Sequence, residues 1–157
     1  MFANRVRAVS LILLAFTVIA AAPAEDGVVK VRSAYPMAET IDRIKQDVAS
    51  KGITFFSAID QSKLAADAGI ELRPSTLLIF GNPALGGQFV TSNPLAGLDW
   101  PVRLLVFQDA DGAVWTAYTD FAWIAHRHRI ADRQAAFDKA TDVIASITST
   151  VQAESPR

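Results

Sequence analysis

The sequence contains no cysteine among its 157 residues. Without thiols the chain cannot carry a disulfide framework, a thiolate zinc site, an iron–sulfur cluster or a cysteine nucleophile. It also lacks an excess of charge, because 15 Lys and Arg side chains stand against 16 Asp and Glu side chains and the charged runs are mixed in sign. Nucleic acid binding requires clustered basic side chains that displace counterions, so we do not expect a nucleic acid partner.

Long hydrophobic runs are confined to the N-terminus. The run Val9–Ala21 has 13 residues, fewer than the ~20 that cross a bilayer. Two arginines precede this run and Ala22-Pro23-Ala24 follows it, which is the pattern of a secretory signal peptide. We therefore expect residues 1–24 to be a signal peptide that is cleaved before Glu25. The mature protein would be periplasmic or secreted, with no membrane contact after cleavage; an uncleaved anchor is the alternative.

The rest of the chain reads as one domain over residues 28–152. Hydrophobic residues make up 51% of the sequence and charged residues 20%, as in ordinary globular proteins. Strand-like and helix-like patterns alternate without a low-complexity linker. Strands are predicted over Val28–Ala34, Ile53–Ile59, Ser75–Phe80, Val102–Phe107 and Val114–Tyr118.

Helices are predicted between these strands and at the end of the chain. Their signals include a cap and proline at Asn82-Pro83 and an apolar stripe at helical spacing along the last segment, made of Phe137, Ala140, Ile144, Ile147 and Val151. The turn Asp109–Gly112 predicts an antiparallel hairpin. Together these features favour an α+β fold with a largely antiparallel sheet, although the early β-α-β alternation leaves a parallel α/β sheet open.

A set of motifs in this part of the chain resembles the domain of unknown function 302 family. The motifs are Leu72-Arg73-Pro74-Ser75, Phe80-Gly81-Asn82-Pro83, Leu98-Asp99-Trp100-Pro101-Val102-Arg103 and Asp111-Gly112-Ala113-Val114-Trp115. The resemblance implies a curved sheet of TATA-binding-protein-like topology with helices packed on one face. It also implies a homodimer, and no established biochemical activity. One departure is Gln61, which stands where the family commonly has His, so a proton-transfer role of that His does not carry over.

Five polar residues in or near these motifs are candidates for binding a ligand: Asp60, Arg73, Asn82, Arg103 and His128. Arg73 can bind a carboxylate or phosphate through two hydrogen bonds, or it can pair with Asp60 or Glu71. Asp60 can serve as a general base, but its position after a strand favours a helix cap. Asn82 also reads as a cap, at a helix N-terminus that could hold an anion.

The two histidines, His126 and His128, do not predict a metal site. On a helix their side chains diverge by about 200°, and adjacent arginines would repel a cation. For His128 we expect a buried structural role instead. Asp109 and Asp111 are explained by the hairpin turn rather than by a calcium loop. We therefore expect neither a metal nor another cofactor.

Two classes of function remain. The first is a binding or interaction module, with the curved sheet and the Arg73–Pro83 segment forming a pocket for a small molecule, an anionic one included. The second is a metal-independent enzyme that uses Asp60, Arg73 and His128 for proton transfer or charge stabilisation. The binding module is favoured because no nucleophile and base can be paired from the sequence. A pocket enclosing a titratable pair within ~3.2 Å would favour catalysis, and an apolar patch would favour association.

Overall fold

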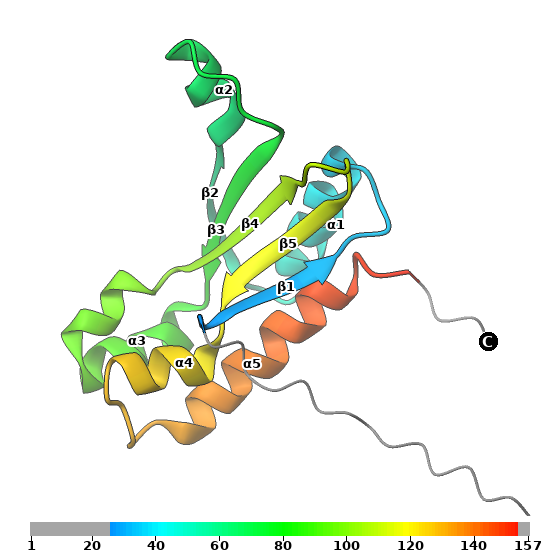
Figure 1. Ribbon diagram of the computed structural model, residues 1–157. Helices are drawn as coiled ribbons and strands as arrows, with labels where there is room; N and C mark the ends of the chain where they lie inside the picture. The colour runs from blue at the N-terminus through cyan, green and yellow to red at the C-terminus, as the bar shows by residue number, and fades with distance from the viewer. Residues whose placement is uncertain (1–25, 154–157) are drawn as a thin grey trace, which may run out of the picture.

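The computed structural model describes residues 26–153, so the predicted signal peptide, residues 1–24, lies outside the described residues. The chain forms a five-stranded sheet in the order β1-β5-β4-β3-β2 (Figure 1). Its strands are β1 (Val28–Arg32), β2 (Thr54–Asp60), β3 (Ser75–Gly81), β4 (Val102–Gln108) and β5 (Val114–Thr119). The helices are α1 (Met37–Ser50), α2 (Gln61–Asp67), α3 (Pro83–Ser92), α4 (Phe121–Arg127) and α5 (Gln134–Ser149), with a short 3-10 helix, η1 (Pro94–Leu98).

All four strand pairings are antiparallel, so the predicted α+β class is confirmed and the parallel alternative is wrong. The five predicted strands match the observed ones to within two residues. The predicted hairpin joins β4 to β5, and Gly112 in its turn has a φ of 81°, a backbone conformation that favours glycine. Local turn chemistry therefore fixed this pairing.

The helices cover one face of the sheet because their apolar stripes must be buried. Along α5 the predicted stripe is buried from Phe137 to Ile147, and Val151 beyond it is fully buried as well. Helix α1 contributes Ile44 and Val48, both fully buried. These side chains pack on the inward residues of the central strands, which are Leu78, Phe80, Leu104 and Val106.

The other face of the sheet is not covered by helices (Figure 1). The apolar run Ser75–Phe80 is typical of a strand that is buried on both faces or lies centrally, and β3 takes the second position, between β4 and β2. Only one of its faces is covered, because buried Leu78 and Phe80 alternate with partly exposed Leu77 and Ile79. Side chains of directly paired residues lie on the same face. The open face therefore includes Ile59, Leu77, Ile79, Arg103, Leu105, Phe107, Trp115 and Ala117, together with Lys30 and Arg32 at the β1 edge.

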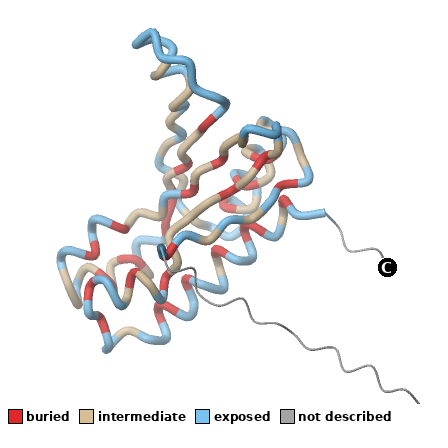
Figure 2. The backbone as a smooth tube through the Cα atoms, viewed as in Figure 1, coloured by how far each residue is buried: buried red, intermediate tan, exposed pale blue. Residues whose placement is uncertain are grey.

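A projecting segment, residues 56–74, forms an arm at one end of the sheet. It consists of the end of β2, helix α2 and the chain leading into β3, and it stands away from the other helices (Figures 1 and 2). A register shift between Phe55 and Ser57 leaves the intervening phenylalanine in a bulge. The arm carries exposed apolar side chains: Phe56 (47%), Leu64 (59%), Ile70 (60%) and Leu72 (48%).

Within residues 26–153, no helix combines the length and the hydrophobicity that a membrane span requires.

Candidate functional site

Asp60 caps helix α2. Its Oδ1 accepts hydrogen bonds from the backbone N–H of Lys63 at 2.9 Å and from the hydroxyl of Ser62 at 2.7 Å. The hydrogen bond from the backbone N–H of Lys63, followed by the one from the Ser62 hydroxyl, holds the pKa of the Asp60 carboxyl below its usual 3.8. A carboxylate stabilised in this way is a weaker base, so the geometry favours the capping role over a general base.

Gln61, the departure from the family pattern, connects the arm to the sheet. Its Oε1 accepts a hydrogen bond from the hydroxyl of Ser75 at 2.8 Å. Ser75 is buried at the start of β3. The glutamine therefore has a structural contact across the base of the arm.

Arg73 lies beside the open face, in a groove of about 660 Å³ beneath the arm. The floor of the groove includes Leu105 and Phe107, and Glu71 and Gln108 also line it. The structural alternative was an ion pair with Asp60 or Glu71, and the ion pairs and hydrogen bonds found between residues 26 and 153 do not include either of these pairs. Arg73 is thus an exposed residue that lines the groove.

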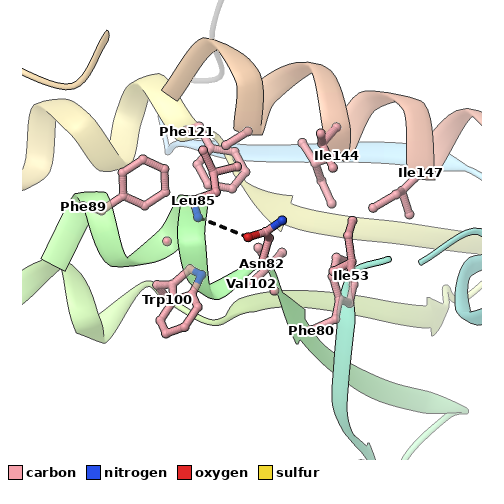
Figure 3. A pocket seen from close by; sticks show the side chains of 14 residues that line it. Ile53, Phe80, Asn82, Leu85, Phe89, Trp100, Val102, Phe121, Ile144 and Ile147 are labelled. Carbon is pink, nitrogen blue, oxygen red and sulfur yellow. Dashed lines mark hydrogen bonds between the residues drawn. The ribbon is translucent and has the colours of Figure 1, made fainter. Parts of the chain in front are cut away.

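Asn82 caps helix α3, as the sequence predicts. Its Oδ1 accepts hydrogen bonds from the N–H groups of Ala84 and Leu85, at 2.9 and 3.2 Å (Figure 3). Pro83 has no N–H, and the N–H of Gly86 already donates to the carbonyl of Asn82. The first turn therefore has no free N–H, and the predicted anion at this helix N-terminus has no backbone donors to bind it.

Arg103 and His128 are brought together by Asp99, a residue that sequence reasoning did not select. Nε2 of His128 lies 2.6 Å from Oδ2 of Asp99. The guanidinium of Arg103 donates to Oδ1 at 3.1 Å, and that of Arg127 donates to both oxygens, at 3.3 and 3.2 Å. We call these four residues the Asp99 cluster.

The Asp99 cluster is a buried carboxylate covered by two half-exposed cations. Only 3% of the Asp99 side chain and 5% of the His128 side chain are exposed, against 49% for Arg103 and 45% for Arg127. The cluster connects the segment before β4 to the end of α4, since Asp99 and Arg127 are 28 residues apart in the sequence. The sequence feature that could have identified Asp99 is its place as a charged residue between Leu98 and Trp100 in a family motif.

The predicted catalytic trio is not assembled. Asp60 and Arg73 flank the arm, where β3 begins, whereas His128 contacts Asp99 near the opposite end of β3 and β4 (Figure 1). The strand from Ser75 to Phe80 alone separates the two ends by roughly 17 Å at ~3.4 Å per residue. Asp60, Arg73 and His128 therefore cannot act on one reacting atom.

The two histidines lie in different surroundings. His126 is exposed on α4, and His128 is buried. Within the described part of the chain, no three His, Asp or Glu side chains converge in an arrangement that could hold a metal ion. Asp109 accepts hydrogen bonds from the backbone of Asp111 and Ala113, as the hairpin interpretation expects.

A cavity of about 40 Å³ lies between the sheet, α3 and α5 (Figure 3). Its lining is apolar apart from Asn82, and it includes Trp100, Phe121 and Ile144. The titratable pair Asp99–His128 does not line it, and the space beside Asp99 is about 10 Å³. The geometry that would favour catalysis, a titratable pair inside a substrate-sized pocket, is therefore not what these residues form.

An open antiparallel sheet with helices on one face places the protein among the small α+β domains. A similar fold occurs in the crystal structure of an uncharacterized conserved DUF302 protein from Bacillus stearothermophilus, with a TM-score of 0.73. The two chains are 16% identical, and the likeness covers 80% of this chain and 98% of the other. At this identity the likeness concerns the fold alone. The chain belongs to the family described as "Domain of unknown function DUF302", whose model matches residues 29–152.

Curated relatives share part of the sequence. Over 106 residues, 68% of this chain, it is 39% identical to a protein of Brucella suis named "Fluoride-specific ion channel FluC 1". A protein of Brucella abortus with the same name is 39% identical over the same length. The chain spans only about two fifths of the length of these relatives, 42% and 39%.

Proposed function

We propose that this protein is an exported binding module that takes a small molecule with an apolar body and an anionic group. The ligand would lie on the open face beneath the arm, with Arg73 binding the anionic group. The observation that carries the proposal is the exposed Arg73 guanidinium above an apolar floor of Leu105 and Phe107. Small-molecule sites combine a mainly apolar lining with a few polar groups that fix the orientation of the ligand.

The charge of the groove sets a condition on the ligand. Glu71 lines the same groove as Arg73, so an anionic group must lie on the Arg73 side, where the planar guanidinium can donate two parallel hydrogen bonds. Gln108 also lines the groove, but its Nε2 already donates to the carbonyl of Gly112. Arg73 is thus the main donor that would recognise the anion.

An enzyme based on Asp60, Arg73 and His128 is not proposed, because these residues lie at two ends of the sheet. The channel name of the curated relatives describes longer proteins, and the proposal for this chain depends on its own groove.

The test is titration of the protein with 8-anilino-1-naphthalenesulfonate, a fluorescent probe with an aromatic body and one anionic group. We expect saturable binding, and Arg73→Lys should weaken it roughly ten- to hundredfold, because a point charge replaces a two-bond fork worth about 1.5–3 kcal/mol per bond. The melting temperature should change little, since Arg73 is exposed.

Arg32→Lys is the matched control. Arg32 lies on the same face, opposite Trp115 in the β1–β5 pairing, but it does not line the groove. Arg103 would not be a suitable control, since it contacts Asp99 and its substitution would disturb the Asp99 cluster. Equal probe affinity in the wild type, Arg73→Lys and Arg32→Lys would overturn the proposal.

A further inference from the structure

A second site is suggested by the internal cavity and by the groove that leads to it. The cavity, about 40 Å³, is lined by apolar side chains of β3, β4, α3, α4 and α5 (Figure 3). Protein interiors are close-packed and contain few voids larger than a water molecule. Since a water needs about 10–15 Å³, this space would accept about three groups of that size. Apolar cavities of this kind stay dry and admit apolar ligands.

The cavity is kept open by the position of Trp100. Its indole ring rests directly on Gly86, where a Cβ atom would overlap the ring, and a Cβ at Gly81 would lie 3.1 Å from its Nε1. The bulky ring therefore lies between β3 and α3 and spaces the helix from the sheet. The space behind the ring cannot be closed by a simple shift of α3.

The cavity continues into a groove on the protein surface. The groove, about 490 Å³, shares four lining residues with the cavity: Ile53, Asn82, Leu85 and Val143. Its remaining lining includes Lys51, Lys139 and Gln88. The lysine-lined groove and the apolar cavity are therefore adjacent and share part of their walls.

The mouth offers donors for an anionic group. Asn82 uses its Oδ1 to cap α3, which identifies the other atom of the amide as the donor Nδ2. Across residues 26–153 this Nδ2 takes part in no hydrogen bond, and Lys139 forms no ion pair. Lys51 differs, because its Nζ contacts both oxygens of Asp47 at 2.6 Å.

We propose that this site binds a short aliphatic carboxylate of about four to eight carbon atoms, with its apolar chain in the cavity and its charged group at the mouth. Lys139 and the amide of Asn82 would bind the carboxylate, and the chain would pass Leu85 and Val143 into the cavity. The groove and the cavity complement the two parts of such a molecule, a charged head and an apolar tail. The site is separate from the groove at Arg73 and does not depend on it.

The test uses hexanoate as the probe and methyl NMR of the whole protein as the readout. We expect saturable shifts at Leu85, Val143 and Ile144, and none at Leu77 and Leu105 of the open face. Shifts only at Leu77 and Leu105 would overturn this site without touching the proposed function. The absence of saturable shifts at the cavity residues up to tens of millimolar would overturn it as well.

Two substitutions test the head and the tail separately. Lys139→Gln should weaken hexanoate binding roughly tenfold, whereas Lys63→Gln on α2, an exposed lysine paired with Asp67, should not change it.

Ala140→Leu places three further carbon atoms in the cavity lining and should abolish the shifts at Ile144. If Ala140→Leu does not fold, hexan-1-ol serves instead: it should bind at the same methyl groups about tenfold more weakly than hexanoate. Equal binding of hexanol and hexanoate, or unchanged binding in Lys139→Gln, would overturn the proposed head group contact.

Discussion

At the scale of single residues, Asp99 has a buried carboxylate that needs charged or hydrogen-bonding partners. It lies almost fully buried and depends on three cationic or titratable partners, Arg103, Arg127 and His128. Removing one member of a buried ion pair leaves the others without compensation. Its role follows from burial and contacts, and it requires no ligand.

Asp99→Asn should therefore lower the free energy of unfolding by about 3 kcal/mol, because His128 and the two guanidiniums lose the charge that they surround. Asp132→Asn is the control, since the Asp132 side chain is 58% exposed in its pair with Arg133 and should cost less than about 1 kcal/mol. Urea unfolding of both variants measures the difference. Equal losses in the two variants would show that the Asp99 cluster contributes no more than a surface pair.

Asp109 should make stability depend on pH. The indole N–H of Trp115, which donates to Asp109 at 2.7 Å, is the main cause that holds the pKa of this carboxyl below its usual 3.8. A folded-state pKa below the unfolded value stabilises the protein above the unfolded pKa, and this contribution is lost as pH falls through the folded pKa. The difference in melting temperature between the wild type and Asp109→Asn should thus be largest near pH 7 and should narrow below about pH 4.

Trp115→Phe provides the check on the cause. In that background the donor is absent, so Asp109→Asn should give a smaller difference that depends less on pH. A difference that stays constant from pH 7 to pH 3 in the wild-type background would contradict the assignment.

At the scale of elements, the contact between α3 and Trp100 decides how close this helix can come to the sheet. Gly86 and Gly87 are neighbours in α3, and they differ in what a side chain would meet. A Cβ at Gly86 would overlap the indole of Trp100, while a Cβ at Gly87 would meet no atom within 4 Å. Substituting each glycine with alanine therefore separates two effects. At Gly87 only helix propensity changes, and at Gly86 the packing against Trp100 changes as well.

Gly87→Ala should raise the free energy of unfolding by up to about 1 kcal/mol, as expected for Gly→Ala in a helix. Gly86→Ala should lower it by about 1–3 kcal/mol, because overpacking forces the ring or the helix to move. Thermal or urea unfolding of the two variants measures these changes in the free energy of unfolding. Stabilisation by both would mean that Trp100 moves freely and does not space the helix.

The arm is the element whose surface is least explained by the monomer. Its apolar side chains include Leu64, Ile70 and Leu72, each about half exposed or more. Apolar patches of this kind mark surfaces of association. The edge strands β1 and β2 also leave backbone groups unpaired on one side.

For the whole molecule we therefore predict a homodimer in which the arm contacts a second copy. Light scattering at high micromolar concentration should give twice the monomer mass. Leu64→Glu combined with Ile70→Glu should give a monomer whose melting temperature, extrapolated to low concentration, matches that of the wild type. Leu95→Glu, at an equally exposed residue of η1 (64%), should leave the dimer intact. A wild-type monomer under these conditions would contradict the prediction.

Export also concerns the whole molecule and stays a prediction from the sequence. Expression in a Gram-negative host, followed by N-terminal sequencing of the periplasmic fraction, should give a chain that begins at Glu25. A chain that begins at Met1 would contradict it.

The sequence alone determined the features that depend on neighbours along the chain. Periodicity gave the strands and helices, Asp109–Gly112 gave the hairpin, and Asp60 and Asn82 gave the caps, because these interactions span only a few residues. The order of strands and helices and the hairpin signal favoured the α+β class.

Only the tertiary structure decided which distant residues meet. Asp99 and His128 are 29 residues apart, and their contact exists because the start of β4 and the end of α4 lie at the same end of the sheet. The sequence likewise left Arg73 between two roles, and the fold shows that it lines a groove together with Leu105 and Phe107 of β4, which are more than 30 residues away in the sequence. Long-range contacts of this kind depend on strand order and helix packing, which local periodicity does not encode.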